Sequence, residues 1–202
     1  MVAVMTEGRQ DGFMSIAEAW PAAGRPFTVA ELDRMPDDGR RYELLDGTLV
    51  VGLRPTNAHQ EVAIELAVQL RLACPRDLRV IPEPAVQLSA TTELDPDIVV
   101  IRREQVHAAK CTAPPLLVVE IRSPSTALID LGHKKAAYER FGVPLYWIVD
   151  PRIANPSLTV FELVAGHYRQ TALIVGDERY RTQRPFPVEV VPSALVAGLV
   201  AD

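Results

Sequence analysis

The stretch from Pro114 to Asp150 constrains the fold of this chain more than any other part of the sequence. It begins with an apolar run, Leu116–Val119, of the kind found in strands that are covered on both faces. A helical pattern follows from about Ala127 to Phe141, and a second apolar run occupies Leu145–Val149. The stretch therefore predicts a strand–helix–strand unit with a right-handed crossover between neighbouring parallel strands.

The predicted helix carries a lysine on its apolar face. Lys134 shares a stripe with Tyr138, whereas Lys135 is rotated away by about 100°. A lysine that faces a core costs free energy unless its ammonium meets a carboxylate or reaches water. Glu120, directly after the first strand, is a candidate partner. The pattern also allows a lysine that reaches solvent, or a helical pair with Asp130.

Length and composition are those of a soluble globular protein. The chain has 202 residues, of which 48% are hydrophobic and 23% charged, which is enough for one domain with a core. We expect this domain to span residues 25–202 and residues 1–24, which show no sustained pattern, to form a flexible arm. No apolar run is long enough to cross a membrane, and the N-terminus lacks the features of a signal peptide.

Cysteine content and charge limit the classes of function. Cys74 and Cys111 give no disulfide framework, so we expect a cytoplasmic protein with reduced thiols. The net charge of −5 argues against a protein that holds DNA by electrostatics alone. It argues less against an enzyme that recruits metal ions, because bound cations supply local positive charge.

The remaining patterns predict short elements on both sides of the central stretch. We expect a capped helix that begins after Thr28, a hairpin with its turn at Asp46-Gly47, and a helix over Asn57–Ala73. The other predicted elements are strands over Leu78–Ile81, Ala85–Leu88, Ile98–Ile101, Leu158–Val164 and Tyr168–Ile174, and a helical turn after Pro192.

Two carboxylates lie at predicted strand ends. Asp97 begins one buried strand and Glu120 ends another, and together they can hold a hard divalent cation, with a backbone carbonyl and waters completing its shell. Such an ion activates water for attack on a phosphate, and a nearby lysine can offset the charge that develops. Glu43 would by default be an exposed strand residue, and His59 a packed or capping histidine.

The order of these patterns resembles a known family. The matching stretches are RYELLDGTLVV, the helix with His59, DPDIVVI, LLVVEIRSPST and DLGHKKAAYERFGVPLYWIVDP. The chain resembles the Uma-type family of restriction-endonuclease-like proteins, within the PD-(D/E)xK nuclease superfamily, from about Thr28 to Tyr168. The resemblance implies an α/β (α+β) fold with a restriction-endonuclease-like core, in which helices flank a mixed sheet of four or five strands, with the site at one edge.

The resemblance also implies roles for individual residues. Asp97 and Glu120 would hold Mg²⁺ (or Mn²⁺), with the carbonyl of Ile121 as a third ligand. Glu43 would be a further acidic residue of the catalytic group, and His59 an accessory polar residue near the cleft.

The chain departs from the superfamily pattern at one position. Arg122 stands where the pattern has a lysine two residues after its glutamate. An arginine can neutralise phosphate charge, but its pKa is too high for it to act as a base. The resemblance suggests that Lys134 supplies the ammonium, and Arg122 then has an alternative role as a salt-bridge partner.

The residues alone predict a metal–carboxylate site with a cationic helper, and the resemblance implies a metal-dependent endonuclease that hydrolyses DNA. We expect it to act as a homodimer, so that two sites address two strands. A different class of function stays open, that of a catalytically silent domain which binds DNA or a protein partner. A third possibility is hydrolysis of a smaller phosphodiester.

Overall fold

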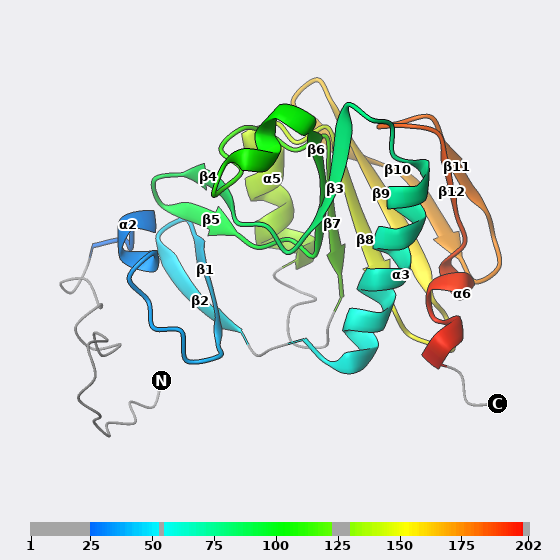
Figure 1. Cartoon of the computed structure of the whole chain (residues 1–202), viewed down its shortest axis with the longest axis horizontal. Helices are drawn as coiled ribbons and strands as arrows, with labels where there is room; N and C mark the ends of the chain where they lie inside the picture. The colour runs from blue at the N-terminus through cyan, green and yellow to red at the C-terminus, as the bar shows by residue number, and fades with distance from the viewer. Residues whose placement is uncertain (1–24, 53–54, 123–129, 200–202) are drawn as a thin grey trace.

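The structure, a computed structural model, describes residues 25–52, 55–122 and 130–199. Its centre is a six-stranded sheet in the order β10-β9-β8-β7-β6-β3 (Figure 1). β7 and β8 are parallel and every other neighbouring pair is antiparallel. The strands are β3 (Leu78–Pro82), β6 (Ile98–Arg102), β7 (Leu117–Ile121), β8 (Leu145–Asp150), β9 (Ser157–Val164) and β10 (His167–Val175).

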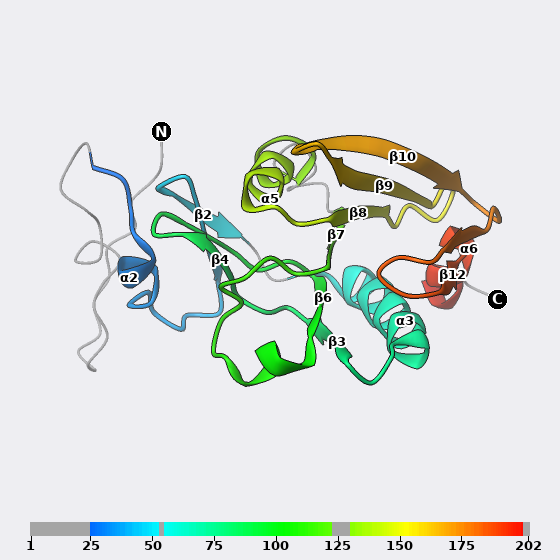
Figure 2. The ribbon, with the colours of Figure 1, turned by 90° about the horizontal axis from the view of Figure 1, so that it is seen from above.

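A four-stranded antiparallel sheet in the order β2-β1-β5-β4 lies beside the central sheet (Figures 1 and 2). Its strands are β1 (Arg41–Leu45), β2 (Thr48–Gly52), β4 (Val86–Ser89) and β5 (Thr92–Leu94). The β1–β2 hairpin turns at Asp46 and Gly47, which both have positive φ, as the Asp-Gly signal predicts.

Helices and one small hairpin complete the structure. The longer helices are α3 (Asn57–Ala73) and α5 (Lys135–Phe141), and a π-helical turn, η2 (Asp130–Lys134), leads directly into α5. The other elements are α2 (Val29–Leu32), η1 (Arg103–His107), α6 (Pro192–Leu195), η3 (Ala197–Leu199) and the hairpin of β11 (Tyr180–Thr182) and β12 (Val188–Val190).

The core occupies both faces of the central sheet. Alternate residues of a strand point to opposite faces, so β6 and β7 contribute apolar side chains to each side. α3 covers one face and α5 the other (Figure 2). The buried stripe of α3 consists of His59, Val62, Leu66 and Leu70.

The fold predicted from the sequence is confirmed in class and in its central unit. β7, α5 and β8 form the strand–helix–strand unit, β7 and β8 are parallel, and α5 is capped at its C-terminus by Gly142, which has a φ of 85°. The predicted bounds of α3 are confirmed, and so is the C-terminal antiparallel pair, whose strands are one or two residues longer than predicted. The arm at residues 1–24 and the predicted helix start near Ala127 lie outside the described residues.

Two expectations were wrong. The central sheet has six strands instead of four or five, and a second sheet stands beside it, partly built from β5, which has three residues and gave no clear pattern. Glu120 does not emerge from a strand end: it lies inside β7, paired with Ile148 of β8, and is buried. The site therefore lies between two sheets and against interior strands of the larger one.

No helix in the described part of the chain is both long and apolar enough to span a lipid bilayer.

Two hairpin glycines provide a matched test of packing. Gly47 (φ +78°) and Gly166 (φ +83°) both adopt left-handed backbone, but a Cβ at Gly47 would lie 2.3 Å from Cβ of Pro26, whereas one at Gly166 would meet nothing within 4 Å. We expect Gly166→Ala to lower the free energy of unfolding by about 1–2 kcal/mol, and Gly47→Ala by about 1–3 kcal/mol more. Chemical denaturation measures both, and equal losses would show that Pro26 moves aside without cost.

Candidate active site

The ammonium of Lys134 lies between two carboxylates from different sheets. Its Nζ is 2.9 Å from Oε1 of Glu43 on β1 and 3.3 Å from Oε1 of Glu120 on β7. Lys134 is 3% exposed, and both glutamates are buried as well. The structure therefore excludes a solvent-reaching lysine at this position. Lys135 points elsewhere, with its Nζ 4.2 Å from the centroid of the Phe161 ring.

Glu120 is held from a second direction by a tyrosine of α5. The hydroxyl of Tyr138 donates a hydrogen bond of 2.9 Å to Oε1 of Glu120, the same oxygen that faces Lys134. Burial and the charge of Glu120 raise the pKa of Tyr138 well above its usual range, so the hydroxyl keeps its proton as donor. A carboxylate inside a buried strand is thus compensated by a hydrogen bond and an ion pair.

Asp97 directly precedes β6 and lies against Ile121, the residue of β7 that follows Glu120. Its Oδ2 accepts a hydrogen bond of 2.6 Å from the backbone N–H of Ile121 and is 3.3 Å from Nε2 of His59. Burial alone would raise the pKa of Asp97, but His59, the Ile121 N–H and Arg41 together hold that pKa below its usual range. For His59, burial lowers the pKa, and the contacts with Asp97 more than compensate, so the pKa is raised.

A guanidinium connects the carboxylates of β1 and of the β5–β6 loop. Arg41 approaches Asp97 at 3.6 Å, Glu43 at 3.9 Å and Asp95 at 4.0 Å. Glu43 also accepts a hydrogen bond of 2.9 Å from the N–H of Asp95. Burial and the charge of Glu43 raise the pKa of Asp95 to about 6. Glu43 is therefore a buried member of the cluster and not an exposed strand residue.

Arg122 lies apart from this cluster. Its NH1 is 2.7 Å from Oδ2 of Asp150 at the end of β8, and Nε of Arg152 is 3.0 Å from Oδ1 of the same carboxylate. Of the two alternatives that the sequence leaves open for Arg122, this placement favours the salt-bridge partner.

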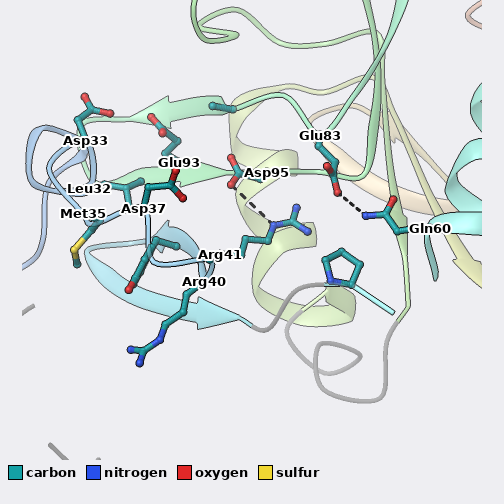
Figure 3. Close-up of a pocket in the computed structure, with 14 residues that line it drawn as sticks. Leu32, Asp33, Met35, Asp37, Arg40, Arg41, Gln60, Glu83, Glu93 and Asp95 are labelled. Carbon is teal, nitrogen blue, oxygen red and sulfur yellow. Dashed lines mark hydrogen bonds and ion pairs between the residues drawn. The ribbon is translucent and has the colours of Figure 1, made fainter. Parts of the chain in front are cut away.

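A hollow of about 690 Å³ opens beside Arg41 (Figure 3). Arg41 of β1 and Asp95 of the β5–β6 loop line one side of it, and Gln60 of α3 and Glu83, which follows β3, line the other. Carboxylates outnumber cations in its lining; the charged residues are Asp33, Asp37, Arg40, Arg41, Glu83, Glu93 and Asp95. A phosphate that entered this hollow would thus meet mainly negative charge.

The junction of β6 and β7 offers oxygen donors for a divalent cation. No three side chains of the types His, Cys, Asp and Glu in the described segments are placed so that they alone could hold a metal ion. The hydrogen bond from the Ile121 N–H nevertheless places the Asp97 carboxylate beside the backbone of Ile121. The carbonyl oxygen of Ile121 is a further possible metal ligand. Carboxylate and carbonyl oxygens are the ligands that Mg²⁺ and Mn²⁺ take in proteins, so the residues present fit such an ion.

The structure brings most of the sequence-predicted residues together. Glu43, Asp97, Glu120 and Lys134 converge, and His59 reaches the group from the first turn of α3; only Arg122 stands outside. Sequence reasoning missed Arg41 and the hydroxyl of Tyr138. Both had a detectable signal, because Arg41 shares a strand face with Glu43 two positions on, and Tyr138 follows Lys134 by one helical turn.

The burial of Lys134 predicts a structural role in the metal-free protein. Lys134→Met keeps the aliphatic stem and removes the charge that two buried glutamates face, so we expect the free energy of unfolding at pH 7 to fall by about 3–5 kcal/mol. Lys135→Ala is the matched control and should cost about 0.5–1 kcal/mol, the value of its contact with Phe161. Denaturant unfolding in EDTA measures both. Equal values for the two variants would contradict the ion-pair geometry.

Comparisons with known proteins agree with this architecture. Residues 29–195 match the Uma2 family, described as "Putative restriction endonuclease". A solved structure of a "putative nuclease belonging to DUF820" from Anabaena variabilis superposes with a TM-score of 0.70 at 17% identity, over 87% of this chain and 100% of that one. No curated protein matches the sequence. Because the family match covers most of the sequence, the chain belongs to the Uma2 family of restriction-endonuclease-like proteins.

Proposed function

We propose that this protein is a Mg²⁺- or Mn²⁺-dependent endonuclease that hydrolyses DNA phosphodiester bonds. The observation that carries the proposal is the buried convergence of Lys134 with Glu43 and Glu120, next to the paired Asp97 and Ile121. Strongly interacting charges that are buried beside a hollow are costly for stability alone and are typical of catalytic sites. Membership of the Uma2 family supports a nuclease and DNA as substrate.

Each residue of the cluster has a role that its contacts support. Asp97 and Glu120 would hold the cation with the carbonyl of Ile121, and the N–H of Ile121 fixes the orientation of the Asp97 carboxylate. A bound divalent cation polarises the phosphate and lowers the pKa of an attacking water. Lys134 would orient that water or offset charge on the phosphate, and Glu43 holds the Lys134 ammonium at 2.9 Å.

The charge of the site makes the cation necessary for substrate binding as well. The chain carries a net charge of −5, and the hollow beside Arg41 is lined mainly by carboxylates. A DNA phosphate would be repelled until bound cations reverse the local charge. DNA binding at the site should therefore depend on metal occupancy. Arg41, 3.6 Å from Asp97, is the arginine of the cluster that lies beside this metal ligand.

The test is cleavage of supercoiled plasmid and of single-stranded DNA with Mg²⁺, Mn²⁺ or EDTA. We expect cleavage with either ion and none in EDTA. Asp97→Asn, Glu120→Gln and Lys134→Met should each lose on the order of 10²-fold or more in rate, the scale seen when one charge-stabilising group is removed. Each variant is assayed with metal in excess and at a temperature where circular dichroism shows it folded.

Two controls separate the assignments. Lys135→Ala and Arg122→Ala should retain activity, since neither side chain contacts the cluster. If Arg122→Ala lost cleavage activity and Lys134→Met kept it, Arg122 and not Lys134 would be the catalytic cation. Metal binding without cleavage of any DNA, but with hydrolysis of a small phosphodiester, would assign that smaller substrate. Absence of both would leave a silent domain that binds DNA or a protein.

An exposed apolar stripe on α3 supports the homodimer that we propose. Ile64, Val68 and Leu72 follow one another at four-residue spacing, and Leu72 is 83% exposed. Val68 and Leu72 also line a shallow hollow of about 250 Å³ with Val80 and Pro82. A second copy of the chain that packs its α3 on this stripe would cover both features.

The dimer is tested by mass in solution. Light scattering should give twice the chain mass for the wild type and the chain mass for Leu72→Glu, because a buried charge without a partner disrupts an apolar interface. Leu173→Glu on β10, where Leu173 is 56% exposed, is the control and should remain dimeric. A wild-type monomer at tens of micromolar would contradict the dimer.

A further inference from the structure

The imidazole of His59 lies within hydrogen-bonding distance of two predicted metal ligands. Its Nε2 is 3.0 Å from the carbonyl oxygen of Ile121 and 3.3 Å from Oδ2 of Asp97. The residue is 9% exposed. The other ring nitrogen, Nδ1, is buried and has no hydrogen-bond partner within the described residues, so the polar contacts of the ring converge on Nε2.

The start of α3 fixes the position of this ring. The N-cap residue Thr56 accepts a hydrogen bond from the backbone N–H of His59 through its Oγ1, at 3.3 Å. One and two turns later the stripe continues with Val62 and Leu66, which are fully buried against the central sheet. The helix is therefore anchored at both ends of this turn, and His59 is held in place before any ligand binds.

The two distances from Nε2 match two edges of an octahedral coordination shell. Ligands about 2.1 Å from a divalent cation in octahedral geometry lie about 3.0 Å from one another along an edge. The separations from Nε2 to the Ile121 oxygen, 3.0 Å, and to Oδ2 of Asp97, 3.3 Å, are close to this edge length. In the metal-free protein the same separations describe an Nε2–H that donates to both oxygens.

We propose that His59 binds the metal ion through Nε2, together with Asp97 and the carbonyl of Ile121, and that this nitrogen makes the site prefer Mn²⁺ to Mg²⁺. The inference rests on the proposed function and specifies its metal. On binding, the ion takes the place of the proton on Nε2; that proton moves to Nδ1 if the ring is neutral, or leaves to solvent if the ring is an imidazolium that already carries a proton on Nδ1. Mg²⁺ binds oxygen almost exclusively, whereas first-row transition metals accept imidazole nitrogen, which is the basis of the preference.

The test uses the full-length protein loaded with Mn²⁺ in the absence of DNA. Pulsed electron paramagnetic resonance should detect ¹⁴N coupling from a directly bound imidazole in the wild type and in His107→Gln, whose exposed side chain lies on η1. The coupling should be absent in His59→Gln and His59→Ala. By calorimetry, His59→Gln should bind Mn²⁺ on the order of 10-fold or more weakly, with a smaller change for Mg²⁺.

The outcomes separate this inference from the proposed function. Wild-type protein that binds Mn²⁺ without ¹⁴N coupling would overturn the role of His59, and the endonuclease proposal would stand if Asp97→Asn loses the ion. Equal Mn²⁺ affinity of His59→Gln and wild type would overturn it as well. Failure of the wild type to bind either ion would overturn both. The wild-type spectrum decides even where a His59 variant does not fold.

Discussion

A single buried ammonium connects the two sheets of this protein. Lys134 reaches Glu43 on the small sheet and Glu120 on the central sheet, so the relative position of the sheets depends on a charge interaction as well as on apolar packing. Burying a carboxylate in a low-dielectric interior costs free energy unless the group is paired, and Lys134 pairs with both glutamates. The residues proposed for the chemistry are thus also residues that connect the two sheets.

Other side chains and one backbone N–H also contact the carboxylates of the site. Tyr138 donates to Glu120, Arg41 lies near Asp97, Glu43 and Asp95, and the backbone N–H of Ile121 donates to Asp97. Each carboxylate therefore has its own donors before a cation arrives. A divalent ion would enter a site whose negative charge is already partly balanced. It would therefore compete with Lys134 and Arg41 for the same carboxylates, and this competition lowers its net binding free energy.

Periodicity in the sequence was sufficient for the central unit and for the orientation of Lys134, because both depend on contacts that are local along the chain. The 3.6-residue pattern placed Lys134 and Tyr138 on one face, and both are buried. Glu120 was misplaced because a carboxylate in a buried strand is acceptable only with partners, and these come from α5 and η2. The small sheet was missed because β1 pairs with β5 across a long separation in sequence and β5 has three residues.

The π-helical turn over Asp130–Lys134 has a consequence for the residues that precede the lysine. Such a turn contains one residue more than the α-helical turn that would replace it. α5 is held by its buried residues Ala137 and Tyr138, so deletion of one residue before Lys134 would close the turn to regular geometry and leave Lys134 in register with Tyr138. The deletion would instead rotate the part of the turn before Lys134 by about 100° relative to α5. The extra residue therefore sets the direction in which the chain enters α5, whereas the regular spacing from Lys134 to Tyr138 sets the direction of the ammonium.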